Sequence, residues 1–233
     1  MLRIKSTTYI KYRKRQSCPM RLVSSVVDLP LRGQDAYAIS DSMLVVADGV
    51  GSWDDRGVDA GIWSHMLVSE IILSDPDIPD TETLLEILRH SVARTRAPGT
   101  STLTLLAMDP STGTAIAYNL GDSVWWHIRD GRVINRSRLT VHGHDVPYQI
   151  GRNPDMSLAN DSIEDGITTR LRLRTDDYLV LASDGITKLL DDTDLVDMLS
   201  DEEPALAALL LSEVIEDIGI EDDTTVIISR IYE

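Results

Sequence analysis

Short runs of β-branched and aliphatic residues recur along this chain, bounded by Asp, Gly, Asn or Pro. Such runs predict short strands. Hairpin turns join some of them directly, at residues 108–114 (MDPSTGT) and 129–132 (RDGR), and strands joined in this way form antiparallel sheets. The predicted strands are 36–40, 44–47, 101–108, 115–120, 123–129, 168–174, 178–182 and 224–231.

Helical periodicity occupies separate blocks, at 58–73, 82–94 and about 193–218. Helices kept apart from hairpin-linked strands predict an α+β layered domain. No linker rich in Pro, Gly or Ser interrupts the 233 residues, so we expect one domain over 1–233. Residues 143–166 lack periodicity, which predicts either a functional loop or a disordered insertion.

Charge is unevenly distributed. The formal net charge is −16, yet the first 21 residues carry seven Lys or Arg and no acid. The acidic remainder argues against a nucleic-acid partner. The basic head is interpreted as an edge strand over 2–12, with a mitochondrial targeting segment as the alternative.

One cysteine, Cys18, excludes an internal disulfide, and no apolar run is long enough to span a membrane. We expect an intracellular protein, cytoplasmic or alternatively mitochondrial.

Aspartates recur at the ends of the predicted strands. Asp48 and Asp184 each follow a buried strand, Asp122 lies in a turn between two strands, and Asp35 and Asp222 precede strands. Any one of them could be ordinary turn chemistry. Together they describe rigid strands that present carboxylates at the edge of a sheet, an arrangement that can hold a hard divalent cation.

Six motifs, in order, carry a family resemblance: GQDAY, VADGVG, GTSTLTLL, NLGDS, ASDGI and DDTTVII. They resemble the metal-dependent protein phosphatases of type 2C over about residues 33–231. VADGVGSW, RGVDAGIWSHML and VHGHDVPYQIG are similar to a short branch that includes mitochondrial phosphatases. The resemblance implies a four-layer α-β-β-α sandwich with two central antiparallel sheets.

The resemblance also implies a binuclear Mg²⁺ or Mn²⁺ site. Asp48 would bridge both ions and the Gly49 carbonyl would bind one of them, while Asp184 and Asp222 would bind the other. Asp122 would contact a third, more weakly held ion.

Two further acidic residues would act around the metals. Asp35 would hold a metal-bound water, and Asp223, where the family usually has Asn, would lie behind the metal ligands. We therefore take Asp48, Asp35 and Asp184 as the catalytic set. The implied reaction is one-step attack on phosphorus by a hydroxide shared between the metals.

Two family residues are absent. The phosphate-binding Arg five residues before the first Asp is Pro30 here, and the His after the bridging Asp-Gly is Val50. Arg32 could replace the first, or could simply be solvated. His142 and His144 could supply a proton near neutral pH, or could be solvated loop residues. Gln34 stands in place of a carboxylate and removes one charge.

The function predicted by the resemblance is hydrolysis of phosphoserine and phosphothreonine in proteins by a monomer. The alternative is a regulatory or binding module with weak or no catalysis on the same fold. A thiol phosphatase is excluded, because Cys18 lacks an Arg six residues later and Ser24 is there instead. We expect Trp63, Trp125 and Trp126 to lie in the core rather than to form an aromatic binding patch.

Overall fold

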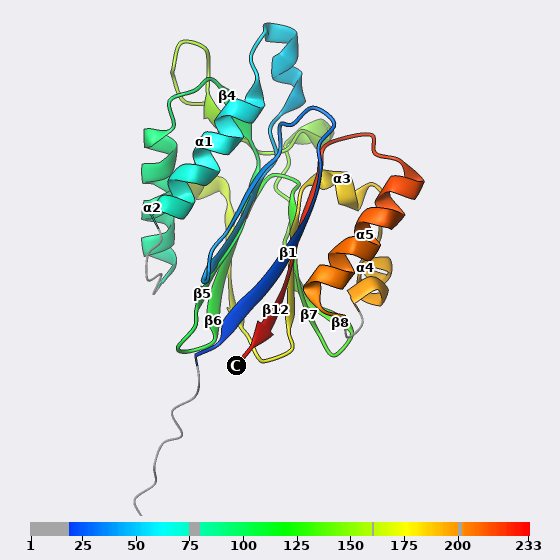
Figure 1. The fold of residues 1–233 in the computed structure, drawn as a ribbon. Helices are drawn as coiled ribbons and strands as arrows, with labels where there is room; N and C mark the ends of the chain where they lie inside the picture. The colour runs from blue at the N-terminus through cyan, green and yellow to red at the C-terminus, as the bar shows by residue number, and fades with distance from the viewer. Residues whose placement is uncertain (1–18, 75–79, 160, 200–201) are drawn as a thin grey trace, which may run out of the picture.

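Two five-stranded antiparallel sheets lie face to face at the centre of the molecule, with helices outside each (Figure 1). The computed structural model describes residues 19–74, 80–159, 161–199 and 202–233. One sheet has the order β10 (Ile167–Arg172), β6 (Thr114–Leu120), β5 (Leu103–Asp109), β3 (Met43–Ala47), β2 (Ala36–Ile39). The other has the order β1 (Arg21–Leu29), β12 (Thr224–Tyr232), β11 (Tyr178–Ala182), β7 (Val124–Arg129), β8 (Arg132–Arg136).

The helices form the two outer layers. Helices α1 (Ala60–Leu73) and α2 (Thr81–Arg94) cover the β2-containing sheet, while α4 (Asp192–Leu199) and α5 (Pro204–Ile218) cover the β1-containing sheet (Figure 1). The predicted four-layer α-β-β-α sandwich is confirmed. None of the helices within the described ranges is long and apolar enough to cross a membrane.

Three apolar clusters separate the four layers, because the central strands bury both faces. In β11, Val180 and Ala182 pack toward α4 and α5, while Leu179 and Leu181 pack between the sheets. This alternation follows from the two-residue period of a strand. The three tryptophans named above are buried, one in each cluster, which confirms that they are core residues: Trp63, Trp125 and Trp126.

Some strands differ from the prediction. β1 was not predicted, although it pairs with β12 along its whole length; its only fully buried residue is Val27, so its apolar signal is weak. β8 was missed for a similar reason, because it is a largely exposed edge strand. The run 101–108 is two strands, β4 (Gly99–Ser101) and β5, since β4 leaves the sheet to pair with β9 (Ile150–Arg152). The edge strand predicted at 2–12 lies outside the described residues.

Two helical predictions need correction. The single helix expected over 193–218 is two helices, and Pro204 occupies the first turn of α5, where its missing N–H costs nothing. A short helix, α3 (Asp184–Thr187), follows β11 where the sequence indicated only a turn. Helix α1 begins at Ala60 because the Asp59 side chain accepts the Gly61 N–H at 2.9 Å.

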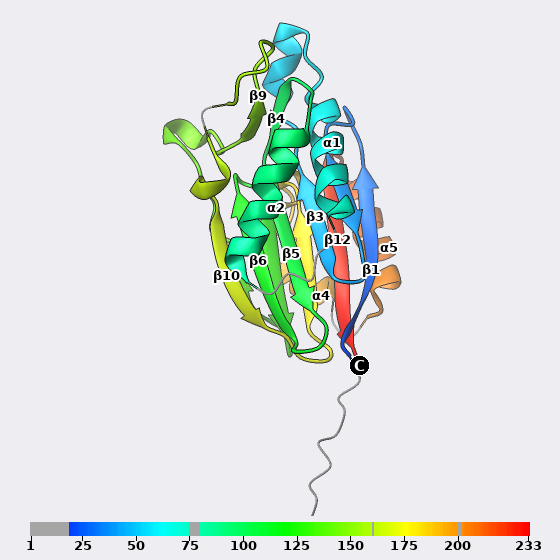
Figure 2. The ribbon, with the colours of Figure 1, turned by 90° about the vertical axis from the view of Figure 1, so that its left-hand side faces the viewer.

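Residues 143–166 contain short elements rather than a featureless loop. They include η2 (Gly143–Asp145), β9 and η3 (Ile163–Asp165). Figure 2 shows β9 with β4 at the end of the sandwich that also carries η1 (Gly51–Arg56). This end of the molecule also receives the strand ends that carry the predicted site residues.

Candidate metal centre

The five aspartates singled out by the sequence come from both sheets. Asp48 follows β3 and Asp184 opens α3 directly after β11. Asp35 and Asp222 precede β2 and β12, the antiparallel partners of those strands. Asp122 lies in the turn between β6 and β7. Antiparallel pairing therefore brings strand ends and strand starts to the same end of the sandwich.

Three of these carboxylates form a compact group. One oxygen each from Asp48, Asp122 and Asp184 lie within 4.8 Å of one another. Asp222 joins through Lys188, whose ammonium lies 2.8 Å from Asp184 Oδ2 and 3.0 Å from Asp222 Oδ2. Every donor in this group is a carboxylate oxygen, the ligand type that Mg²⁺ and Mn²⁺ prefer.

Electrostatics show how closely the carboxylates interact. Burial raises the pKa of Asp48 well above its usual range, and the charges of Asp35, Asp184, Asp122 and Asp222 raise it further. Burial and the neighbouring Asp184 also raise the pKa of Asp122 to about 6. Lys188 offsets only part of this negative charge, and a divalent cation would supply the positive charge that is still missing.

Asp35 is the most isolated member. It is 8% exposed, and within the described ranges neither of its oxygens has a hydrogen-bond partner of ordinary geometry. Burial raises its pKa to about 7, and the Asp223 and Asp184 charges add to that rise although the Ser183 and Thr225 hydroxyls oppose it. A buried carboxylate without donors is costly unless a cation or an ordered water satisfies it. This arrangement fits a divalent metal site.

Asp223 organises the segment that leads into Asp35. Its Oδ2 accepts the Gln34 N–H at 2.6 Å, and its Oδ1 accepts three successive backbone N–H groups, from Leu31, Arg32 and Gly33. Burial would raise the pKa of Asp223, but these backbone hydrogen bonds outweigh it and hold the pKa below its usual value. The predicted position behind the metal ligands thus has a definite structural role, which is to fix the 31–34 segment.

Gly49 is required sterically in this arrangement. Its N–H donates to the Gln34 carbonyl at 3.2 Å, and a Cβ at this position would lie 2.6 Å from the same oxygen. The sequence indicated a glycine whose carbonyl reaches an ion, and that role stays a prediction. The structure supplies an independent reason, the close approach of the 31–34 segment.

Arg32 faces the η1 helix. Its Nη1 lies 3.7 Å from Asp54 Oδ2, and its side chain is 57% exposed. Gln34 Nε2 donates to the other oxygen of Asp54 at 2.9 Å. Arg32 therefore has Asp54 as its ion-pair partner, and its role as a phosphate clamp stays a prediction.

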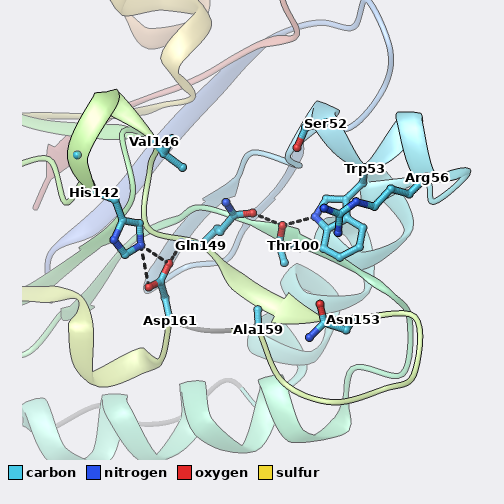
Figure 3. Close-up of a pocket in the computed structure, with 11 residues that line it drawn as sticks. Ser52, Trp53, Arg56, Thr100, His142, Val146, Gln149, Asn153, Ala159 and Asp161 are labelled. Atoms are coloured by element: carbon cyan, nitrogen blue, oxygen red, sulfur yellow. Dashed lines mark hydrogen bonds and ion pairs between the residues drawn. The ribbon is translucent and has the colours of Figure 1, made fainter.

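Of the two histidines, His142 lines a separate pocket of about 500 Å³ (Figure 3). His142 Nε2 is 2.9 Å from Asp161 Oδ1, and its ring packs on Tyr148 at 4.2 Å. His144 is exposed, with a left-handed backbone at φ 67°. In the contacts that the structure describes, His142 pairs through Nε2 with Asp161 rather than with the metal-site aspartates, and its role as a proton donor stays a prediction.

A polar network forms the other wall of this pocket. Trp53 Nε1 donates to Thr100 Oγ1 at 2.6 Å, and Thr100 in turn bonds to Gln149 (Figure 3). The Thr100 carbonyl accepts the Val50 N–H at 3.0 Å, two residues after Asp48. The pocket therefore adjoins the carboxylate cluster through β4.

Sequence reasoning missed two residues that touch the cluster. Thr102 holds Asp48 by accepting its N–H at Oγ1 (3.3 Å) and donating its own N–H to the Asp48 carbonyl (2.9 Å). Lys188 bridges Asp184 and Asp222. Lys188 could have been found, since it follows Asp184 by four residues, the spacing of an ion pair on a helix. Thr102 gives no such local signal.

Comparison with known proteins identifies relatives over most of the chain. Residues 40–232 match the family described as Stage II sporulation protein E (SpoIIE). Protein phosphatase PTC7 homolog fig of Drosophila simulans is 34% identical over 181 residues, covering 72% of this chain and 58% of that protein. The homolog of Drosophila pseudoobscura pseudoobscura is 32% identical over 183 residues, covering 72% and 54%. The chain thus spans little more than half the length of these curated relatives.

Solved structures share the fold. The photosystem II phosphatase PBCP superimposes with a TM-score of 0.79 at 21% identity, over 90% of this chain and 98% of that one. The catalytic domain of the serine threonine protein phosphatase PstP, in complex with two manganese ions, gives a TM-score of 0.67 at 17% identity, over 92% and 100%.

Proposed function

Because the chain belongs to the metal-dependent protein phosphatases of type 2C, within the family described as Stage II sporulation protein E, we propose that it hydrolyses phosphoserine and phosphothreonine in proteins. The observation that carries this proposal is the convergence of carboxylate oxygens from Asp48, Asp122 and Asp184 within 4.8 Å. The names of the relatives, protein phosphatase PTC7 homologs, support the same reaction.

The residues divide into two metal positions that share Asp48. Asp48 and the Gly49 carbonyl would hold one Mg²⁺ or Mn²⁺, and Asp48, Asp184 and Asp222 the other. Asp122 stands beside them, where a third ion would bind more weakly. Bound divalent cations supply charge stabilisation to a phosphoryl group and lower the pKa of a water molecule.

Two side chains would position the reactants, Asp35 the attacking water and Arg32 the substrate phosphate. Asp35, whose oxygens have no hydrogen-bond partner of ordinary geometry among the described residues, would accept a hydrogen bond from the attacking water and orient it toward phosphorus. Arg32, beside η1, is the cation that we propose to bind the phosphate from the protein side.

A regulatory or binding module with weak catalysis is the competing function. It is favoured by the positions of Arg32, which pairs with Asp54, and His142, which pairs with Asp161. The substrate would still be a phosphoprotein, and we propose a monomer. An intracellular location, cytoplasmic or alternatively mitochondrial, is part of the same proposal.

Replacement of Asp48 by Asn tests the enzyme proposal. Asp48→Asn keeps the side-chain shape but removes the charge shared by both metal positions, so kcat on a phosphothreonine peptide in saturating Mn²⁺ should fall at least about 10³-fold. Arg32→Ala should cost less, about 10-fold, chiefly in KM.

The matched control is Asp176→Asn, the same chemical change at an exposed carboxylate paired with Arg230, which should keep wild-type activity. Circular dichroism verifies folding of all variants. Equal, low turnover by wild type and Asp48→Asn would reject the enzyme and support the binding module.

A further inference from the structure

Lys188 is the only lysine after residue 14 in the sequence, and it lies in the aspartate cluster. Its Nζ is 2.8 Å from Asp184 Oδ2 and 3.0 Å from Asp222 Oδ2. Its charge also reaches Asp122, where it opposes the larger effects of burial and of Asp184 on that carboxylate's pKa. One ammonium thus neutralises part of the charge of three of the five aspartates.

Local packing fixes the position of this ammonium. Lys188 directly follows the one-turn helix α3 as its C-cap residue, four residues after Asp184, so its stem runs back along the helix toward that carboxylate. Gly185 packs against the chain before β12 so tightly that a Cβ would lie 2.4 Å from Thr224 Oγ1 and 2.5 Å from the Asp223 carbonyl. This contact holds Asp222 within reach of Lys188.

The two oxygens that bind Lys188 belong to the residues proposed to hold one of the metal ions. An ammonium and a divalent cation cannot both bind Asp184 Oδ2 and Asp222 Oδ2 closely, because like charges a few ångströms apart repel strongly when partly buried. A metal ion at this position must therefore displace the ammonium. The position at Asp48 and Gly49 carries no such competitor among the described residues.

We propose that Lys188 is a tethered cation that occupies the Asp184–Asp222 position of the metal-free protein and competes with a divalent ion for it. The two metal positions then have unequal affinities for a divalent ion, and Lys188 lowers the affinity of the Asp184–Asp222 position. This inference rests on the metal site of the proposed function and adds a residue that tunes it.

Calorimetric titration of the metal-free protein with MnCl₂ tests the inference directly. Wild type should show a tighter Mn²⁺ site at Asp48 and Gly49 and a weaker site at Asp184 and Asp222, in addition to any third ion held at Asp122. Lys188→Met keeps the stem length but removes the charge, so the dissociation constant of the weaker site should fall at least about tenfold, while that of the tighter site changes less than about threefold.

Arg94→Met is the matched control. It also removes one positive charge, but from an exposed arginine on α2 that pairs with the partly buried Glu70 on α1. It should leave both dissociation constants within about twofold of wild type. Lys188→Gln, which can hydrogen-bond to both carboxylates, is titrated in parallel in case Lys188→Met unfolds without metal, and should tighten the weaker site in the same direction.

The outcomes separate the two proposals. Unchanged Mn²⁺ affinity in folded Lys188→Met or Lys188→Gln would overturn the role of Lys188 and leave the metal site intact. The same gain in Arg94→Met would also overturn it, because the effect would then come from net charge alone. If neither wild type nor the Lys188 variants bound Mn²⁺ at millimolar concentration, the metal site and the proposed function would fail as well.

Discussion

The buried carboxylate of Asp35 lowers the stability of the folded protein when it is charged and no cation is bound beside it. Its folded-state pKa of about 7 exceeds the usual value of 3.8, so the folded protein binds this proton more tightly than the unfolded chain. Stability therefore falls as pH rises through the window from about 4 to 7. Asp48 and Asp122, whose pKa values are also raised, act in the same direction.

Asp35→Asn should remove the loss of stability that the buried Asp35 charge causes at high pH. In EDTA the wild-type melting temperature should drop between pH 5 and pH 8, and Asp35→Asn should melt higher than wild type at pH 8 because no charge is buried. In excess Mn²⁺ at pH 8 the order should reverse, since the carboxylate then contributes to cation binding. Thermal melts of both proteins in these three conditions check this. A variant that melts lower than wild type in EDTA at pH 8 would contradict the buried-charge interpretation.

At the scale of elements, the connection from β1 to β2 is held by the residue that precedes β12. Asp223 accepts four backbone N–H groups between Leu31 and Gln34. The same connection places Asp35 at the cluster and Arg32 beside Asp54 of η1. A side chain 190 residues away from Gly33 in sequence therefore sets the geometry of the site.

Asp223→Asn should loosen this connection. The amide group would turn one acceptor into a donor and leave at least one N–H unpaired, so the free energy of unfolding should fall by about 2–4 kcal/mol at pH 7. Because the folded-state pKa of Asp223 is below 3.8, its contribution is present above that pH and is lost as pH falls through the folded-state value. Urea unfolding at pH 7 measures the loss.

Hydrogen exchange of the 31–34 amides should be faster in the same variant. The control is Asp130→Asn in the exposed turn between β7 and β8, whose left-handed backbone at φ 51° accepts Asn readily. If Asp223→Asn and Asp130→Asn had equal free energies of unfolding, the four hydrogen bonds to Asp223 would make no net contribution to stability.

For the whole molecule, the apolar layer between the sheets supplies the rigidity that keeps strand ends from both sheets together. Leu181 is fully buried there, next to Trp125 on β7 and Ile227 on β12. Asp184 follows it by three residues. The core thus positions the cluster but contributes no ligand to it.

Leu181→Ala should lower the stability of the fold without changing the affinity of the site for Mn²⁺. Loss of buried contacts and the resulting cavity should lower the free energy of unfolding by about 2–5 kcal/mol, whereas Leu139→Ala, at a half-exposed position, should change it by less than about 0.5 kcal/mol. Denaturant titration compares the two. The Mn²⁺ dissociation constants of folded Leu181→Ala should stay within about threefold of wild type; a larger change would mean that the core also shapes the ligand geometry.

The sequence by itself determined the fold class and the identity of the clustered carboxylates. Strands such as β3 and β11 are buried on both faces, so each appears as an unbroken apolar run, and the Asp after each run marks the strand end. These are local signals, because burial and turn chemistry act on neighbouring residues. The family motifs added the order of those signals along the chain.

Only the tertiary structure decided how the cluster is completed. Edge strand β1, the Asp223 contacts with residues 31–34, and the Lys188 bridge to Asp222 all join segments that are distant in sequence. Their partners are backbone N–H groups, strand edges and carboxylates whose proximity depends on the packing of two sheets. A polar edge strand looks like ordinary surface in the sequence. The spacing of Lys188 indicates only its pair with Asp184, because its second partner, Asp222, is 34 residues away and local periodicity cannot specify it.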